Sequence, residues 1–263
     1  MPHSDAFSKQ KSKMAVALVL TFSSGIVDIA GFLGVFQLFT AHLTGTTVHL
    51  GQSIVLGHET ESIAAFAIVL AFFLGSVFGR AIIEAGGRRC RLRRVATITL
   101  AIQAAILAFV AVAKTASGQS HAAANGSPAH IYFYLALLAF AMGMQTATLT
   151  GIGALTVHTT FVTGMINKLA QLISHILFRA YDFLRGRANT PERRAEQSAE
   201  SAQAVFIFSV WVCYVLGAAS GTASYMRWGI RALFVAITGL LVGIVTDLFN
   251  PLSIQEEHEQ SER

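Results

Sequence analysis

Two short segments hold most of the residues whose types could do chemistry. Residues 40–57 read TAHLTGTTVHLGQSIVLG, and residues 151–178 read GIGALTVHTTFVTGMINKLAQLISHILF. Both are rich in Thr, His, Gln and Gly, although each is long enough to cross a bilayer. Polar or non-helical backbone is tolerated inside a membrane only where protein or a water-filled cavity surrounds it. Such segments favour a path for a small polar solute.

Asp28 is the one carboxylate near the middle of a long apolar run, residues 14–39. A charged group there costs roughly 2.5–3.5 kcal/mol to insert and normally faces a cavity or a partner. Asp28 is therefore either a protonatable or cation-binding group in a translocation path, or a structural acceptor for the backbone of a broken helix. Lys168 could pair with Asp28, or it could extend its aliphatic stem to the cytoplasmic interface.

The two polar segments share a Thr-Gly pair, Thr44-Gly45 in the first and Thr163-Gly164 in the second. Glycine tolerates unusual backbone angles and a threonine hydroxyl can satisfy a freed carbonyl, so each pair could break a helix at membrane depth. The alternative is close packing at a helix crossing. Our predicted transport path comprises the following residues: Asp28, His42, Thr44, Gly45, Gln145, Thr163, Gly164 and Lys168.

Histidines raise the possibility of a metal. His42 and His49 are seven residues apart, on one helical face, while His158 and His175 lie in the second segment. Their positions do not coincide between the segments, and no H-E-x-x-H pattern is present. We therefore predict no metal, no cofactor and no catalytic residue.

The elements that must position these residues are membrane helices. Charged residues make up only 13% of the 263 residues, against about 25% in soluble domains, and hydrophobic residues make up 54%. Two cysteines are too few for a disulfide framework. These values exclude a soluble enzyme and a disordered chain. The six apolar runs that qualify as spans, or come close, are residues 14–39, 63–79, 95–113, 131–147, 204–224 and 230–249.

The two halves of the chain resemble each other. The Thr-Gly pairs match, and the run LGSVFG at residues 74–79 matches LGAASG at residues 216–221. Small-xxx-small spacing allows close helix packing or dimerisation, and it occurs at Gly75, Gly79, Gly217 and Gly221. Basic residues form three clusters, which are Lys9, Lys11 and Lys13, then six arginines within residues 80–94, and five arginines within residues 179–194. If both Thr-Gly segments are broken or re-entrant, all three clusters lie in the cytoplasm, which makes the halves inverted repeats.

The fold class predicted from these patterns is an all-α polytopic bundle of about six spans plus two broken or re-entrant Thr-Gly segments. Its parts are a basic cytoplasmic N-terminus (1–13), a first membrane repeat (14–113), an external loop (114–130), a second membrane repeat (131–249) with a polar cytoplasmic insertion (179–202), and an acidic C-terminal tail (250–263).

The run GIVDIAGFLGVFQLFTAHLTGTTVHLG, together with GMQTA and TTFVTGMINKLAQ, resembles the DUF1275 (YoaK-like) family of multi-pass membrane proteins. The resemblance covers nearly the whole chain from Met14 to Phe249 and implies no settled activity. The positions that look like the family's motif are Asp28, Gly31, Phe32, Thr44, Gly45, Thr47, Gly143, Gln145, Thr160, Val162, Thr163 and Gly164. The sequence departs from the pattern at His42, Thr46 and Thr146, where asparagine would be usual.

Three functions stay open at this point. The first is a permease or channel for an unknown small solute, in which Asp28 provides coupling or selectivity. The second is a membrane enzyme acting on a lipid, with His42, His49 or His158 as base or metal ligand, and the third is a non-catalytic scaffold or assembly factor. The expected partners are the lipid bilayer, a small solute and a second copy of the chain, with no nucleic acid. The expected location is a plasma membrane or bacterial inner membrane, with the N-terminus in the cytoplasm.

Overall fold

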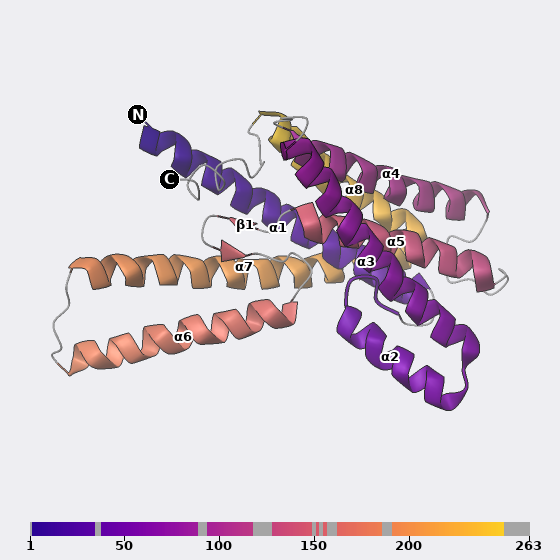
Figure 1. Ribbon diagram of the computed structural model, residues 1–263, viewed down its shortest axis with the longest axis horizontal. Coiled ribbons are helices and arrows are strands. Elements are labelled where there is room, and N and C mark those ends of the chain that lie inside the picture. The colour runs from indigo at the N-terminus through magenta and orange to yellow at the C-terminus, as the bar shows by residue number, and fades with distance from the viewer. Residues whose placement is uncertain are drawn as a thin grey trace.

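The computed structural model is a bundle of helices (Figure 1). It describes residues 2–34, 38–88, 94–117, 128–148, 151–152, 155–156, 162–185 and 191–249. Their elements, in chain order, are α1 (Pro2–Gly34), α2 (Leu43–Leu56), α3 (Glu59–Arg88), α4 (Val95–Ala116), α5 (Pro128–Thr148), β1 (Gly151–Ile152), β2 (Leu155–Thr156), α6 (Val162–Leu184), α7 (Pro191–Trp228), the 3₁₀ turn η1 (Gly229–Ala232) and α8 (Leu233–Phe249).

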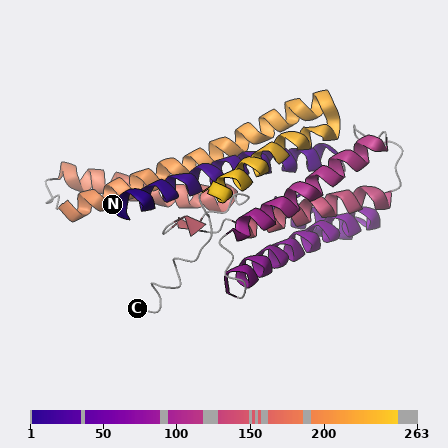
Figure 2. The same cartoon turned by 90° about the horizontal axis from the view of Figure 1, so that it is seen from above.

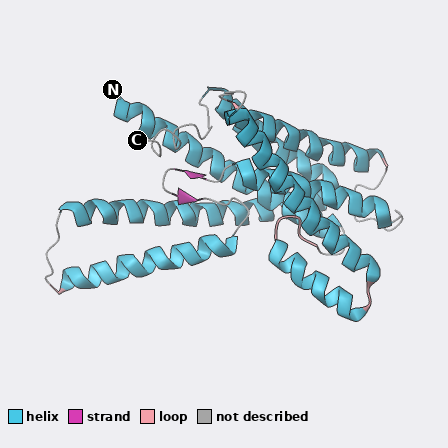
Figure 3. Cartoon of the chain, in the orientation of Figure 1, coloured by secondary structure: helices cyan, strands magenta, loops and turns pink. Residues whose placement is uncertain are grey.

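The predicted fold class, an all-helical membrane bundle, is confirmed (Figure 3). The described strands are the two-residue pair β1 and β2, which is antiparallel. Within the described residues, four helical stretches can cross a membrane by length and composition: Gln10–Gly34, Glu59–Gly86, Val95–Ala116 and Glu196–Phe249. The last of these runs through α7, η1 and α8.

The most extensive helix contacts join helices that are not neighbours in the chain. α1 packs along α7, and α3 packs along α5, while α4 and α8 contact each other and complete the bundle. α2 lies against α3 and α6 lies against α7. In Figures 1 and 2 the α6–α7 hairpin extends out from the rest of the bundle. Many large apolar side chains on the outer faces are exposed, as a lipid-facing surface requires.

Glycines set how closely α3 and α5 approach. A Cβ on Gly75 of α3 would collide with the backbone carbonyl of Phe140 on α5. Conversely, a Cβ on Gly143 of α5 would collide with the backbone carbonyl of Phe72 on α3. The two backbones are therefore in direct contact, which only small residues allow.

The α1–α7 pair has the same construction. A Cβ on Gly217 would collide with the backbone carbonyl of Phe22, and one on Gly25 would lie 2.5 Å from the carbonyl oxygen of Tyr214. One turn beyond these contacts, Gly79 faces Met144 and Gly221 faces Ile26. All four glycines of the small-xxx-small motifs thus lie at helix crossings.

Some boundaries differ from those expected. The first helix ends at Gly34 instead of continuing to residue 39, because the chain turns back toward Asp28. In the expected polar insertion, residues 179–184 belong to α6 and residues 191–202 form the first turns of α7. Ala, Glu, Gln and Arg are good helix formers there, and Arg179 forms ion pairs with Glu196 and Glu200. Most of the 114–130 loop and the 250–263 tail lie outside the described residues.

Gly75→Ala and Gly217→Ala are each expected to lower stability by about 1–3 kcal/mol, because the added methyl forces packed backbones apart. Gly51→Ala is the matched control, since Gly51 lies inside α2 with open space around its Cβ position. Thermal unfolding of the purified protein in detergent measures the effect. Equal unfolding temperatures for Gly75→Ala and Gly51→Ala would show that the backbone contact does not limit stability.

Candidate functional site

Hydrogen-bond donors from separate parts of the chain converge on the carboxylate of Asp28. This residue lies on α1, six residues before the helix ends, and is 1% exposed. Its Oδ1 accepts hydrogen bonds from the backbone N–H groups of Thr40 and Ala41, both at 2.8 Å. The Thr40 hydroxyl donates to the same oxygen at 3.1 Å. Residues 38–42 therefore return along the side of α1, about 9 Å from its end at a rise of 1.5 Å per residue.

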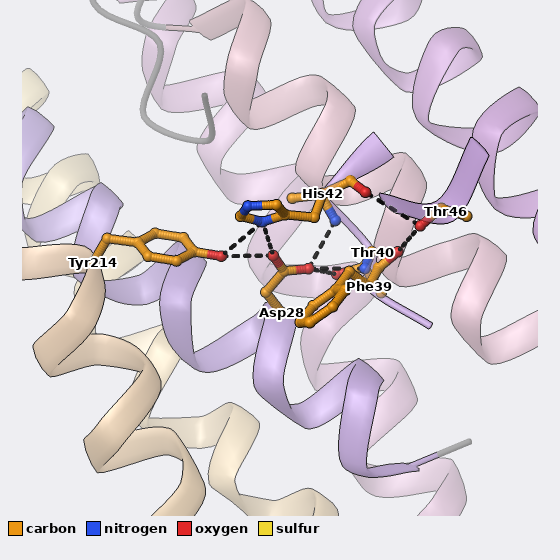
Figure 4. Close-up of polar contacts among 7 residues, drawn as sticks. Asp28, Phe39, Thr40, His42, Thr46 and Tyr214 are labelled. Atoms are coloured by element: carbon orange, nitrogen blue, oxygen red, sulfur yellow. Dashed lines mark hydrogen bonds and ion pairs between the residues drawn. The ribbon is translucent and has the colours of Figure 1, made fainter. Parts of the chain in front are cut away.

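The other carboxylate oxygen faces a phenol and an imidazole (Figure 4). Tyr214 of α7 donates its hydroxyl to Asp28 Oδ2 at 2.6 Å, and His42 Nδ1 lies 3.2 Å from the same atom. Tyr214 Oη and His42 Nδ1 are 3.3 Å apart, so the three groups form a triangle. The side chain of His42 is 37% exposed whereas that of Asp28 is 2% exposed. His42 is thus the exposed member of the cluster.

The local sequence explains why the loop folds back. The ring of Phe39 stacks on that of Phe32 at 4.5 Å between centroids and lies 5.5 Å from the ring of His42. The Thr46 hydroxyl donates to the carbonyl oxygen of Phe39 at 3.0 Å. α2 begins one residue after His42, without a side-chain cap. Aromatic packing and threonine hydroxyls therefore hold a non-helical connection beside the first span.

This arrangement can do two kinds of chemistry. A carboxylate has only acceptors, and hydrogen-bond donors here satisfy both of its oxygens. The site can thus hold a negative charge among neutral donors, or share a proton between Asp28 and His42. The hydrogen bonds of Asp28 match the structural alternative, an acceptor for the backbone of a broken chain, and the imidazole of His42 stays accessible for proton exchange.

The Thr-Gly pairs lie at the first turns of helices. Thr44 and Gly45 are exposed near the beginning of α2, and Thr163 and Gly164 are exposed near the beginning of α6. The helix interruption thus precedes Thr44-Gly45 instead of falling on it. Neither pair is among the hydrogen-bond partners of Asp28 in the described part of the chain.

Lys168 is exposed on α6 and is not among the partners of Asp28. The hypothesis of a Lys168–Asp28 pair is therefore wrong in this structure. Gln145 of α5 is 2% exposed, and its Nε2 donates to the carbonyl oxygen of Leu20 and to Ser24 Oγ, both at 2.8 Å. It is buried against α1 one turn before Asp28.

The remaining histidines are spread over the structure. His49 lies 3.5 Å from Glu61, and His175 lies 3.7 Å from Glu200. His158 lies outside the described residues. Within the described part of the chain, no group of three or more His, Cys, Asp or Glu side chains is placed to hold a metal ion.

Three members of the site, Thr40, Ala41 and Tyr214, were absent from the predicted path. Thr40 stands at the edge of the first polar segment, where its backbone rather than its side-chain type makes the main contact. Tyr214 is a single phenol within the apolar run VWVCYVLG. A buried tyrosine hydroxyl normally needs a polar partner, and that signal could have indicated a pairing with Asp28.

Comparison with known proteins assigns the chain to a family. Residues 16–246 match the family described as "Protein of unknown function (DUF1275)". The chain belongs to the DUF1275 family. It is also similar to the UPF0700 transmembrane protein YoaK of Bacillus subtilis (strain 168), with 27% identity over 160 residues that cover 61% of this chain and 67% of that protein. No solved structure matches. The predicted family is confirmed, and the chain is an integral membrane protein.

Tyr214→Phe is expected to destabilise this DUF1275 protein by about 1.5–3 kcal/mol, because it removes a hydrogen bond to a charged group in the core. Tyr225→Phe is the control: Tyr225 is a buried tyrosine of the same helix, and its hydroxyl makes no hydrogen bond with a described residue. Unfolding of both variants in detergent gives the comparison. A Tyr225→Phe loss as large as the Tyr214→Phe loss would contradict the assigned role of Tyr214.

Proposed function

We propose that this protein is a permease or channel for a small solute and that the interrupted chain beside Asp28 is its central site. The observation that carries the proposal is a buried carboxylate, inside a spanning helix, that binds the backbone of the returning segment. Transporters commonly build solute and ion sites at such interrupted helices. His42 adds an accessible imidazole, a group that exchanges protons near neutral pH.

The helix packing supports a duplicated, inverted architecture. α1 packs on α7 and α5 packs on α3, so the first long helix of each proposed half contacts the third helix of the other half. The second helices, α2 and α6, both carry the Thr-Gly pair in their first turn and both lie against the helix that follows them. Two related halves would give this pattern.

The proposed topology has six crossing helices: α1, α3, α4, α5, α7 and α8. Basic residues support a cytoplasmic N-terminus, since Lys11 and Lys13 lie at the start of the first span, Arg88 ends α3 and Arg94 precedes α4. α2 and α6 would then enter the membrane from opposite sides. The proposed membrane is a plasma membrane or a bacterial inner membrane.

Thiol labelling of intact cells tests this topology. In a background with Cys90 and Cys213 replaced by serine, single cysteines are placed at Glu59, Ser117 and Arg194. Glu59→Cys and Ser117→Cys are expected to react with a membrane-impermeant reagent, and Arg194→Cys only after permeabilisation. Reaction of Glu59→Cys and Arg194→Cys from the same side would overturn the inverted arrangement.

Asp28→Asn tests the site itself. In proteoliposomes, uptake of methylammonium, acetamide, urea, glycerol and formate is followed with and without a pH gradient. The variant is expected to reduce the flux of the transported solute roughly tenfold or more and to change its pH dependence, because it removes the charge inside the span.

Asp247→Asn is the matched control for Asp28→Asn. Asp247 is a fully buried carboxylate on α8 that accepts hydrogen bonds from the Thr97 backbone and hydroxyl, at 2.9 and 2.6 Å, away from the candidate site. Flux unchanged in Asp28→Asn, or lost equally in both folded variants, would remove the assigned role of Asp28. Absence of flux for any solute, with effects of both variants on stability alone, would favour a membrane scaffold. The proposal assigns no catalytic step to the protein.

A further inference from the structure

A second group of buried polar side chains lies in the bundle, apart from the Asp28–His42–Tyr214 triangle. It comes from α1, α5 and α4 and is termed the buried polar line: Ser24, Gln145, Thr148, Gln103 and Thr99. Each member is at most 5% exposed. Burying hydroxyls and amides in an apolar bundle costs free energy unless they form hydrogen bonds. A row of five such side chains therefore indicates a structural or functional role.

Hydrogen bonds and single helical turns connect the line from end to end. Ser24 lies one turn before the candidate carboxylate on α1 and accepts from Gln145 Nε2 at 2.8 Å. Thr148 follows Gln145 on α5 by three residues, about 4.5 Å along a helix. Gln103 Nε2 donates to Thr148 Oγ1 at 3.3 Å, and Thr148 Oγ1 lies 3.1 Å from Thr99 Oγ1. The line thus leads from the candidate site to the beginning of α4.

One acceptor of the line has no hydrogen-bond partner among the described residues. The side-chain carbonyl oxygen of Gln103 is buried and makes no hydrogen bond with a described residue. Its orientation follows from Thr148, whose hydroxyl donates to the carbonyl oxygen of Met144 at 2.8 Å and therefore accepts from the amide N–H. While the Thr148 hydroxyl donates to Met144, turning the amide over would place two acceptors against each other. The free group is thus a carbonyl oxygen that needs a donor.

We infer that the buried polar line is a binding path for the solute and that the Gln103 carbonyl binds an N–H group of that solute. The inference rests on the proposed permease function and names its solute class: a small ammonium or a primary amide. The line begins beside Asp28 and ends next to the helix start that follows Arg94, so it forms the cytoplasmic half of the proposed passage.

The chemistry of the line selects this class. The group without a partner among the described residues, the Gln103 carbonyl oxygen, is an acceptor. Asp28 lies beside the Ser24 end of the line, and the five members include no basic side chain. An anion would meet acceptors without a compensating cation, which is costly in a buried site. An ammonium or an amide offers N–H donors to the Gln103 carbonyl and to the threonine hydroxyl oxygens.

Ligand-induced stabilisation tests the inference without requiring transport. Thermal unfolding of the full chain in detergent is followed by tryptophan fluorescence with methylammonium, acetamide or formate, each added as a concentration series. Methylammonium, acetamide or both are expected to raise the unfolding temperature, and formate is not. Gln103→Leu is expected to weaken that binding about tenfold, whereas Gln52→Leu, an exposed site on α2, leaves it unchanged.

Gln103→Glu keeps the size of the side chain and separates the two solute types. If the solute is cationic, this variant is expected to bind methylammonium more tightly and acetamide more weakly. If the solute is a neutral amide, Gln103→Glu is expected to bind both methylammonium and acetamide more weakly than the wild type does. The wild type is then expected to bind acetamide more tightly than methylammonium. The affinities of the wild type for the two solutes are measured first. If Gln103→Leu then fails to fold, the change of these affinities in Gln103→Glu is the deciding observation.

The outcomes separate this inference from the proposed function. Stabilisation by formate, stabilisation that persists in folded Gln103→Leu, or no stabilisation by either N–H donor overturns the inference. If that happens while Asp28-dependent flux is present, the permease proposal stands without it. If N–H donors bind at Gln103 and no flux is found, the binding line stands and the permease proposal fails.

Discussion

The need to satisfy one buried carboxylate governs the structure. Asp28 lies inside a helix that is otherwise apolar over most of its length, where an uncompensated charge would be costly. The solution is to end α1 early and return the next segment alongside it, so that two backbone N–H groups and a threonine hydroxyl reach the carboxylate. The position of α2, the exposure of His42 and the tie to α7 all follow from that arrangement.

Close backbone contact is the second constraint, and it differs in kind from the first. The α1–α7 and α3–α5 crossings are held at glycine positions, where dispersion contacts replace the hydrophobic effect that lipid cannot supply. Because both pairs join helices far apart in sequence, the bundle has no boundary that coincides with the middle of the chain. A rigid-body movement would therefore displace helix pairs drawn from both ends of the sequence.

The amino-acid pattern was informative where a single residue meets a strong physical cost. An acid inside an apolar run predicted a cavity or a partner for Asp28, and small-xxx-small spacing predicted either internal close packing or dimerisation at Gly75 and Gly217. The pattern could not name the partners, since Tyr214 lies 186 residues from Asp28 and periodicity says which face is buried but not against what. The same limit left Lys168 open between a pair with Asp28 and the cytoplasmic interface, and Lys168 is not among the hydrogen-bond partners of Asp28. The polar residues 185–202 were compatible with a linker or a short helix, and residues 191–202 form the first turns of α7.

The short distance in sequence between Asp28 and most of its partners has a consequence for biogenesis. At a synthesis rate of about 5–20 residues per second, Tyr214 leaves the ribosome roughly 9–35 s after His42. During that interval α1 is already made while α7 does not yet exist. Thr40, Ala41 and His42 are available almost as soon as Asp28 itself, so the returning loop can shield the carboxylate before the distant phenol arrives. The loop thus supplies hydrogen bonds to the carboxylate early in synthesis, before the finished bundle encloses it.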